Sequence, residues 1–180
     1  MEIIKGITKR SSVRKFTSEP VSDEELKTIL LAGDCAPVSM GRYETMQLTV
    51  VRDAGVLKRI GAGASIVMSK VFGKEMKSPF NFYGAKTLVV ISSKESAIKG
   101  INFANGGTIA ENMMLQAAEG GIGSCVIWFA AAAINADAEL KKSLGISEDM
   151  NALFAVALGH SAIPVPEKTP DSMKIKCNYV

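Results

Sequence analysis

The segment 106–119 constrains the fold of this chain most strongly, because it predicts a helix that is apolar over an unusually wide surface. One stripe at helical spacing holds Ile109, Met113 and Ala117, and a second apolar stripe lies one residue further along. Two adjacent stripes offer more apolar surface than the face of one sheet normally covers. The helix is therefore either a central core helix or a core helix that also contacts a partner subunit, and the sequence favours neither.

The remaining apolar patterns alternate between helices and strands without an internal repeat or linker, so we expect one domain over residues 1–180. Ser22 and Glu25 form a capping box, which predicts the start of a helix that ends near Gly33. Strands are predicted at 47–52, 87–92, 125–129 and 153–158, with further helices at 2–9, after Asp53 and up to Gly145. The tail, about 161–180, is too polar and extended to pack alone, and we expect it on a partner subunit.

Composition and charge exclude several classes of partner. The net charge of +3 is too small for a nucleic-acid binder, which needs a clustered basic face. No apolar run reaches the roughly 18 residues that a membrane span requires. The N-terminus lacks the apolar stretch of a signal peptide. We therefore expect a cytoplasmic protein with neither a nucleic-acid nor a membrane partner.

Few residues offer metal ligation or side-chain catalysis. Cys35, Cys125 and Cys177 lie far apart and outside CxxC spacing, which predicts free thiols in a reducing compartment. His160 is the only histidine, so a multi-histidine metal site cannot form. The carboxylates are scattered, and no pair is set apart as an acid/base couple. The sequence predicts no metal site and no essential catalytic side chain.

A basic segment with two hydroxyls follows the first predicted helix. Residues 9–15, Lys-Arg-Ser-Ser-Val-Arg-Lys, place four cations and two hydroxyls in seven positions. In an extended turn the side chains of Arg10, Ser12 and Arg14 point the same way, which is sufficient to hold one phosphomonoester. A solvated basic turn explains the same residues, and spacing alone favours that interpretation.

The glycine clusters do not form a dinucleotide-binding fingerprint. Gly61-Ala62-Gly63 lies inside a helical pattern, and Asn105-Gly106-Gly107 is expected at the start of the long helix. Residues 120–123 are expected to end that helix, and no Walker-type lysine follows any cluster. The segment 37–42 combines small, polar and flexible residues, and by itself it indicates only a connecting loop.

Five segments occur in order along nearly the whole chain. The first two are Arg-Ser-Ser-Val-Arg-Lys-Phe at 10–16 with Pro20-Val21, and Ala-Pro-Val-Ser at 36–39 ahead of Val50-Val51. The other three are Tyr-Gly-Ala at 83–85 entering the strand at 88–91, Glu-Asn-Met-Met-Leu-Gln-Ala-Ala at 111–118 with 121–125, and Leu-Gly-Ile at 144–146 with Ala-Leu-Gly-His at 157–160. Together these segments resemble the nitroreductase-like family of FMN-dependent enzymes. The resemblance implies an α+β, three-layer fold with a central, mainly antiparallel sheet flanked by helices. It also implies an intertwined homodimer with FMN bound at the subunit interface.

The resemblance assigns cofactor contacts to individual residues. Arg10, Ser12 and Arg14 are expected to hold the FMN phosphate, with Ser11 and a tail lysine, first Lys168 and second Lys176. The loop after the second helix is expected to border the ribityl chain and flavin ring, from the other subunit. The main-chain N–H groups of the stretch at the end of the third strand are expected near the flavin N5 edge. The candidates in these last two regions are Pro37, Val38, Ser39, Met40, Met46, Ile127 and Trp128.

Two departures from the family pattern concern the surroundings of the flavin. Arg42 and Glu44-Thr45-Met46 stand where relatives commonly carry Asn and Gln-Pro-Trp. Trp128 and Phe129 replace small residues, which implies a narrower cavity. These changes bear on the substrate more than on the cofactor.

The implied activity is transfer of electrons from NADH or NADPH through FMN to a small organic acceptor of nitroaromatic or quinone type, in a ping-pong reaction. The cofactor would carry the chemistry, and the protein would supply orientation and electrostatics. Three alternatives remain: another reaction on the same fold, such as reductive dehalogenation; a flavin-binding or sensory module with little turnover; and a phosphate-binding helical domain without flavin.

Overall fold

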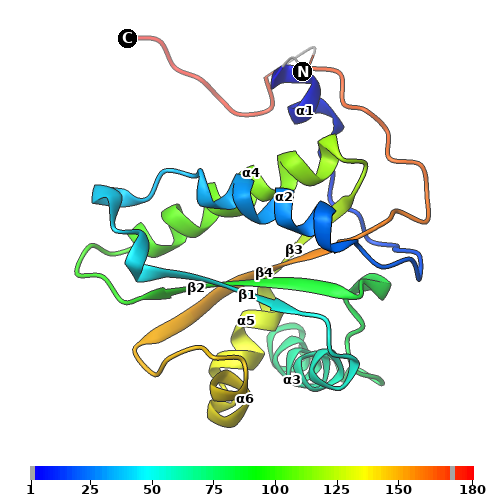
Figure 1. Ribbon diagram of the computed structural model, residues 1–180, viewed down its shortest axis with the longest axis vertical. Coiled ribbons are helices and arrows are strands. Elements are labelled where there is room, and N and C mark those ends of the chain that lie inside the picture. Colours follow the sequence, from blue (N-terminus) through cyan, green and yellow to red (C-terminus); the bar gives the residue numbers. More distant parts are fainter. Residues whose placement is uncertain (1–2, 171–172) are drawn as a thin grey trace.

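The computed structural model describes residues 3–170 and 173–180. Its centre is a sheet with the strand order β1-β2-β4-β3, in which every pairing is antiparallel. The strands are β1 (Met46–Val51), β2 (Thr87–Lys94), β3 (Gly123–Ile127) and β4 (Met150–Gly159). Helices cover both faces of this sheet (Figure 1). The α+β class and the flanked antiparallel sheet are confirmed.

One face of the sheet is covered by α2 (Asp23–Asp34) and α4 (Ile101–Glu119), and α1 (Ile3–Lys9) packs against α4 (Figure 1). Met113 of α4 is fully buried in this layer. It packs with Ile29 of α2 and with residues of the two central strands, such as Val89 and Val156. The wide apolar surface of the long helix is thus buried partly by the sheet and partly by α2.

The opposite face is covered by α3 (Ala54–Phe72), α5 (Trp128–Asn135) and α6 (Ala138–Ser143) (Figure 1). Its core joins Ile60, Ile134 and Leu140 of the helices to Leu88 and to neighbouring strand residues. Short 3-10 turns occupy Ser39–Gly41, Tyr43–Thr45 and Phe82–Gly84. The two cores lie on the two faces of the sheet, which makes the molecule three layers deep.

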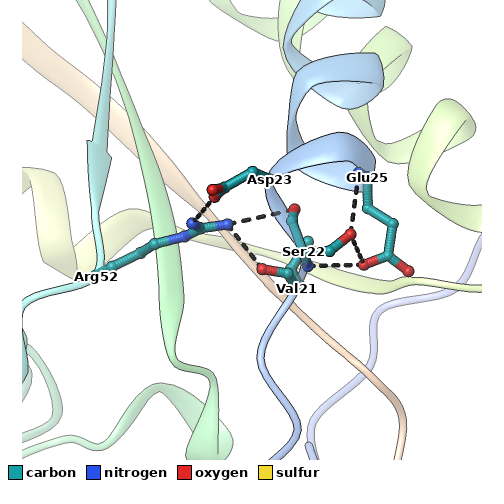
Figure 2. A network of polar contacts seen from close by, with 5 residues as sticks. All are labelled: Val21, Ser22, Asp23, Glu25 and Arg52. Atoms are coloured by element: carbon teal, nitrogen blue, oxygen red, sulfur yellow. Dashed lines mark hydrogen bonds and ion pairs between the residues drawn. The ribbon is translucent and has the colours of Figure 1, made fainter.

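The start of α2 is fixed by the predicted capping box. The Glu25 backbone N–H donates to Ser22 Oγ at 3.2 Å, and the Ser22 backbone N–H donates to Glu25 Oε2 at 2.7 Å. Arg52, just after β1, donates to the Val21 carbonyl at 2.7 Å and pairs with Asp23 (Figure 2). This network ties the end of the edge strand to the beginning of α2.

Several element boundaries differ from the sequence prediction; β4, for example, begins at Met150, three residues before the predicted start at 153. The strand predicted at 125–129 ends at Ile127, and Trp128 begins α5, which the sequence analysis missed. Four alanines at 130–133 favour a helix, and they pack it closely against α3 and β4. The long helix begins at Ile101, five residues before the predicted start at 106. Gly106 therefore lies inside the helix. Its lack of a side chain allows close packing on β4, because an added Cβ would be 2.9 Å from Leu153 Cδ1.

Candidate functional site

The basic segment runs extended beside the first residues of β3. The Val13 N–H donates to the Ser124 carbonyl at 2.9 Å, and Ser12 forms a parallel bridge with Ser124. The Val13 side chain is buried in the core, whereas Ser12 and Arg14 are exposed. In an extended segment neighbouring side chains alternate between faces. Burial of Val13 therefore turns Ser12 and Arg14 outward.

Cations gather around this segment. Arg10 Nε lies 3.4 Å from Glu111 Oε1 of α4, and Lys168 Nζ donates to the Arg10 carbonyl. The Lys168 N–H donates to the Thr8 carbonyl at 3.0 Å, which fixes the tail against the end of α1. Burial and the Arg10 cation both lower the pKa of Lys168, partly offset by Glu111. The site therefore holds neighbouring positive charges whose mutual repulsion a bound anion would relieve.

Cys125 reports the positions of both arginines. Burial raises the pKa of its thiol, and the nearby charges of Arg14 and Arg10 partly offset that rise. Both guanidinium groups therefore lie within electrostatic reach of the same buried sulfur, at the start of β3. Lys168 contacts Arg10 directly, and Arg14 lies four positions further along the same extended segment. We call Arg10, Arg14 and Lys168 the cationic cluster.

The tail contributes a cation that the sequence analysis missed. The charge of Lys174 also lowers the pKa of Lys168, so Lys174 lies near the cationic cluster. Lys176, the second expected tail lysine, is exposed. Only the path of the tail distinguishes these lysines, because all of them lie in a polar segment without regular spacing. Glu111 was likewise missed as a partner of Arg10, since its sequence context indicates only a helical position.

A cavity of about 380 Å³ lies beside the basic segment, on the face that carries Val13 and not the cationic cluster. Ser11 and Lys9 line it from the basic segment, and Ser124 lines it from β3. Val165 and Glu167 of the tail border it as well. The tail is held there because Thr8 Oγ1 donates to Glu167 Oε1 at 2.7 Å. Ser11 thus faces this cavity, whereas Ser12 is turned outward with Arg14.

The expected loop after α2 packs on the N-terminal half of α4. Thr108 Oγ1 donates to the Pro37 carbonyl at 3.1 Å, and the Ser39 N–H donates to Asn105 Oδ1 at 3.1 Å. Val38 is buried, whereas Met40 is 75% exposed with a φ of 57°. This loop contacts Asn105 and Thr108 of α4, and Arg10 contacts Glu111 of the same helix. Within one chain the loop and the cationic cluster remain on different turns of the helix.

A second cavity, of about 310 Å³, lies beside that loop. Met40 and Arg42 line it from the loop, and Lys94 and Asn102 line it from the end of β2 and the start of α4. Met46, the first residue of β1, is half-buried against the α2–α4 core. The side of this cavity thus carries two cations with an exposed thioether.

The end of β3 carries an exposed aromatic pair. The Ile127 side chain is buried in the α3–α5 core. Trp128 is 55% exposed, and its ring stacks on Phe103 of α4 with centroids 5.7 Å apart and an interplanar angle of 21°. Trp128 lies four positions after Ser124, which spans about 13 Å at the rise of a strand. The cationic cluster and the aromatic pair therefore lie at opposite ends of β3.

The surface between these ends is open. Val126, midway along β3, is 41% exposed. Gly107, on the neighbouring helix α4, is exposed, and an added Cβ there would meet no heavy atom within 4 Å. Within residues 3–170 and 173–180 no group of His, Cys, Asp and Glu is arranged to hold a metal ion. In the same ranges no helix has the length and apolarity needed to cross a membrane.

Comparisons with known proteins agree with this architecture. The chain is 27% identical to a nitroreductase with bound FMN from Bacteroides fragilis, with a TM-score of 0.83 over 99% of this chain and 100% of that one. A nitroreductase with bound FMN from Desulfitobacterium hafniense gives the same identity and TM-score, over 99% of each chain. An NADPH-flavin oxidoreductase from Vibrio harveyi is 25% identical over 172 residues, which are 93% of this chain and 67% of that protein. The family model of the nitroreductases matches residues 7–160, and the chain therefore belongs to the nitroreductase family.

Proposed function

We propose that this protein is an FMN-dependent oxidoreductase that passes electrons from NADH or NADPH to a small organic acceptor of nitroaromatic or quinone type. The cationic cluster at the start of β3 carries this proposal, in a chain whose similar solved structures contain bound FMN. The NADPH-flavin oxidoreductase among its relatives supports the choice of electron donor. The three free thiols fit a reducing cytoplasm.

The residues of the cluster fit a phosphate group. Arg10 and Arg14 offer planar pairs of N–H donors, and Ser11 and Ser12 offer hydroxyls beside them. Lys168 adds a cation from the tail, and we assign a supporting role to Lys174 because its charge acts on Lys168. Gathering like charges is unfavourable without a counter-ion. Glu111 balances part of this charge, and a dianionic phosphate would balance the rest.

FMN, when bound, accepts two electrons from a nicotinamide and delivers them to an acceptor, and the proposed kinetic order is ping-pong. The protein's own part is to orient the ring and to balance charge. Arg42 and Lys94 border the second cavity, where Glu44 and Asp149 pair with them, and their N–H groups would be donors near the ring. The loop residues 37–40 and Met46 lie on that side, and the main-chain N–H groups at Ile127 and Trp128 would face the flavin edge.

We further propose that the protein is a homodimer in which each FMN contacts both subunits. The loop at 37–40 contacts α4 at Asn105 and Thr108, and in the dimer the corresponding loop of the second subunit would border the FMN. The tail supports this assembly because Met173, Ile175 and Tyr179 alternate with polar residues and are 72–89% exposed. An apolar groove of about 370 Å³ between α2 and the edge strand β1 would receive a partner's tail.

The experiment for this proposal is reconstitution followed by steady-state kinetics. We expect purified protein to retain FMN, seen as visible flavin absorbance after gel filtration, and to oxidise NADH or NADPH with quinone or nitroaromatic acceptors. Failure to bind added FMN would contradict the flavin assignment. Bound flavin that supports no oxidation of either nucleotide would instead indicate a binding module.

A further inference from the structure

The stacked pair of Trp128 and Phe103 joins the start of α5 to α4 at the molecular surface. The two rings are stacked nearly parallel at 5.7 Å, and their side chains are 55% and 47% exposed. Phe82 is fully buried in the core, whereas Phe72 and Tyr43 are exposed at 63% and 49%. Exposure alone therefore does not single out the pair, and its position does. A stacked surface pair leaves one broad aromatic face exposed to water, and covering that apolar face with a ligand would be favourable.

The position of the pair relative to the cationic cluster suggests its use. Ser124, beside the cluster, and Trp128 are separated by about 13 Å along β3. The surface between them is open at Val126 and Gly107. An elongated cofactor held by its phosphate at the cluster would direct its other end along this surface toward Trp128. Electron transfer occurs at that ring end, so an acceptor has to dock there too.

We propose that Trp128 is the docking surface for the ring of the acceptor and that Phe103 is a positioning residue, which holds the indole by stacking on it. This inference rests on the proposed flavin function and adds the residue that recognises the planar ring of the acceptor. A flat ring continues the existing stack by offset stacking on the indole, which an inorganic ion or an aliphatic acceptor cannot do. The rest of the acceptor is unconstrained by this contact.

The test compares two acceptors within each variant. Menadione offers a planar fused ring, and ferricyanide is a small ion without one. We expect Trp128→Leu to lower the ratio of kcat/KM for menadione to that for ferricyanide by about tenfold, mainly through KM, because one aromatic stacking contact is lost. Trp128→Phe keeps a stacking ring and should stay within about threefold of the original ratio. Phe103→Leu should lower the ratio less than Trp128→Leu does.

Fluorescence supplies a second readout that needs no turnover. Trp128 is the only tryptophan of the chain, so its emission reports this site alone. Menadione added to the oxidised, FMN-loaded protein without nucleotide should quench this emission saturably. Phe103→Leu should raise the menadione concentration needed for half-maximal quenching. Ile66→Ala is the matched control, because Ile66 is an exposed apolar residue of α3 at 59%. It should leave both the ratio and the quenching unchanged.

Several results would overturn the inference. An unchanged ratio in Trp128→Leu, with FMN bound and ferricyanide reduced, would remove the docking role and leave the oxidoreductase function standing. Loss of flavin in that variant would assign Trp128 to cofactor binding, and a change from dimer to monomer would assign it to the subunit contact. A wild-type protein that binds no FMN would overturn both proposals together.

Discussion

Arg10 is the residue on which the proposed cofactor site depends most directly. Its guanidinium pairs with Glu111, and its carbonyl accepts from Lys168. The side chain is only 21% exposed, so α4 and the tail hold it in one place before any ligand arrives. A preorganised guanidinium loses little conformational entropy on binding, which is why a site of this kind suits a phosphate.

Arg10→Ala and Arg14→Ala should each weaken FMN binding by about tenfold to a hundredfold, because each removes charge-assisted hydrogen bonds to the phosphate. Fluorescence titration of the apoprotein with FMN measures the affinity, and sedimentation should show that the dimer persists. Lys58→Ala removes one charge from the exposed side of α3 and serves as the control. Equal losses in all three variants would mean that overall charge, and not this cluster, attracts the cofactor.

The lowered pKa of Lys168 predicts that cofactor binding depends on pH. Burial and Arg10 lower its pKa from 10.5, and a bound phosphate favours the charged form of the ammonium. FMN affinity should therefore fall as pH rises through this lowered pKa, where the free site loses its proton.

Titrations at neutral and alkaline pH measure this effect. Lys168→Arg should flatten the alkaline fall because the guanidinium stays charged, and Lys168→Met should weaken binding already at neutral pH. The same fall in the wild type and in Lys168→Arg would show that another group titrates.

At the level of elements, the sequence predicted those helix starts that hydrogen bonds between neighbouring residues determine. The capping box of Ser22 and Glu25 fixed the start of α2 from sequence, and the structure confirms both of its hydrogen bonds. The β3–α5 boundary was missed because Trp128 and Phe129 favour a strand by propensity. The helix forms there because the small alanines after them allow close packing against α3, which is a tertiary effect.

Ser22→Ala should lower the free energy of unfolding by about 1 kcal/mol at neutral pH, the usual cost of losing an N-cap. Hydrogen bonds from the Ser22 hydroxyl and backbone N–H lower the pKa of Glu25. The associated stabilisation is present above the unfolded pKa of the carboxyl and is lost as pH falls through its lowered folded value.

Urea denaturation at neutral and acid pH checks this prediction. The difference between Ser22→Ala and the wild type should shrink toward acid pH. Thr28→Ala, which removes an exposed hydroxyl in the same helix, is the control. A difference that stays constant with pH would contradict the role of the Glu25 carboxylate.

At the scale of the whole molecule, the sequence predicted the strands themselves but not how they are ordered in the sheet. Strand patterns predicted four strands, yet the order β1-β2-β4-β3 depends on pairings between segments far apart in the chain. The gathering of Arg10, Glu111 and Lys168 depends on the same long-range packing. Residue chemistry therefore indicated the basic segment as a candidate, and only the fold brought the tail and α4 to it.

The proposed dimer makes a prediction about the tail. Ile175→Asp should weaken dimerisation, because it places a charge on the apolar side of a segment that we expect to bury against the partner. Sedimentation at decreasing protein concentration measures the effect, and FMN should be lost in parallel. Asn178→Asp adds the same charge at a polar position of the tail, and it should leave the dimer intact. Dissociation in both variants would indicate general repulsion instead.

The central claim is that this chain uses FMN to move electrons from a nicotinamide to an organic acceptor. The most direct test is anaerobic addition of NADH or NADPH to the FMN-loaded protein, followed by an acceptor. The visible flavin absorbance should bleach with one of the nucleotides and return when menadione is added. Flavin that stays oxidised with both nucleotides would contradict it.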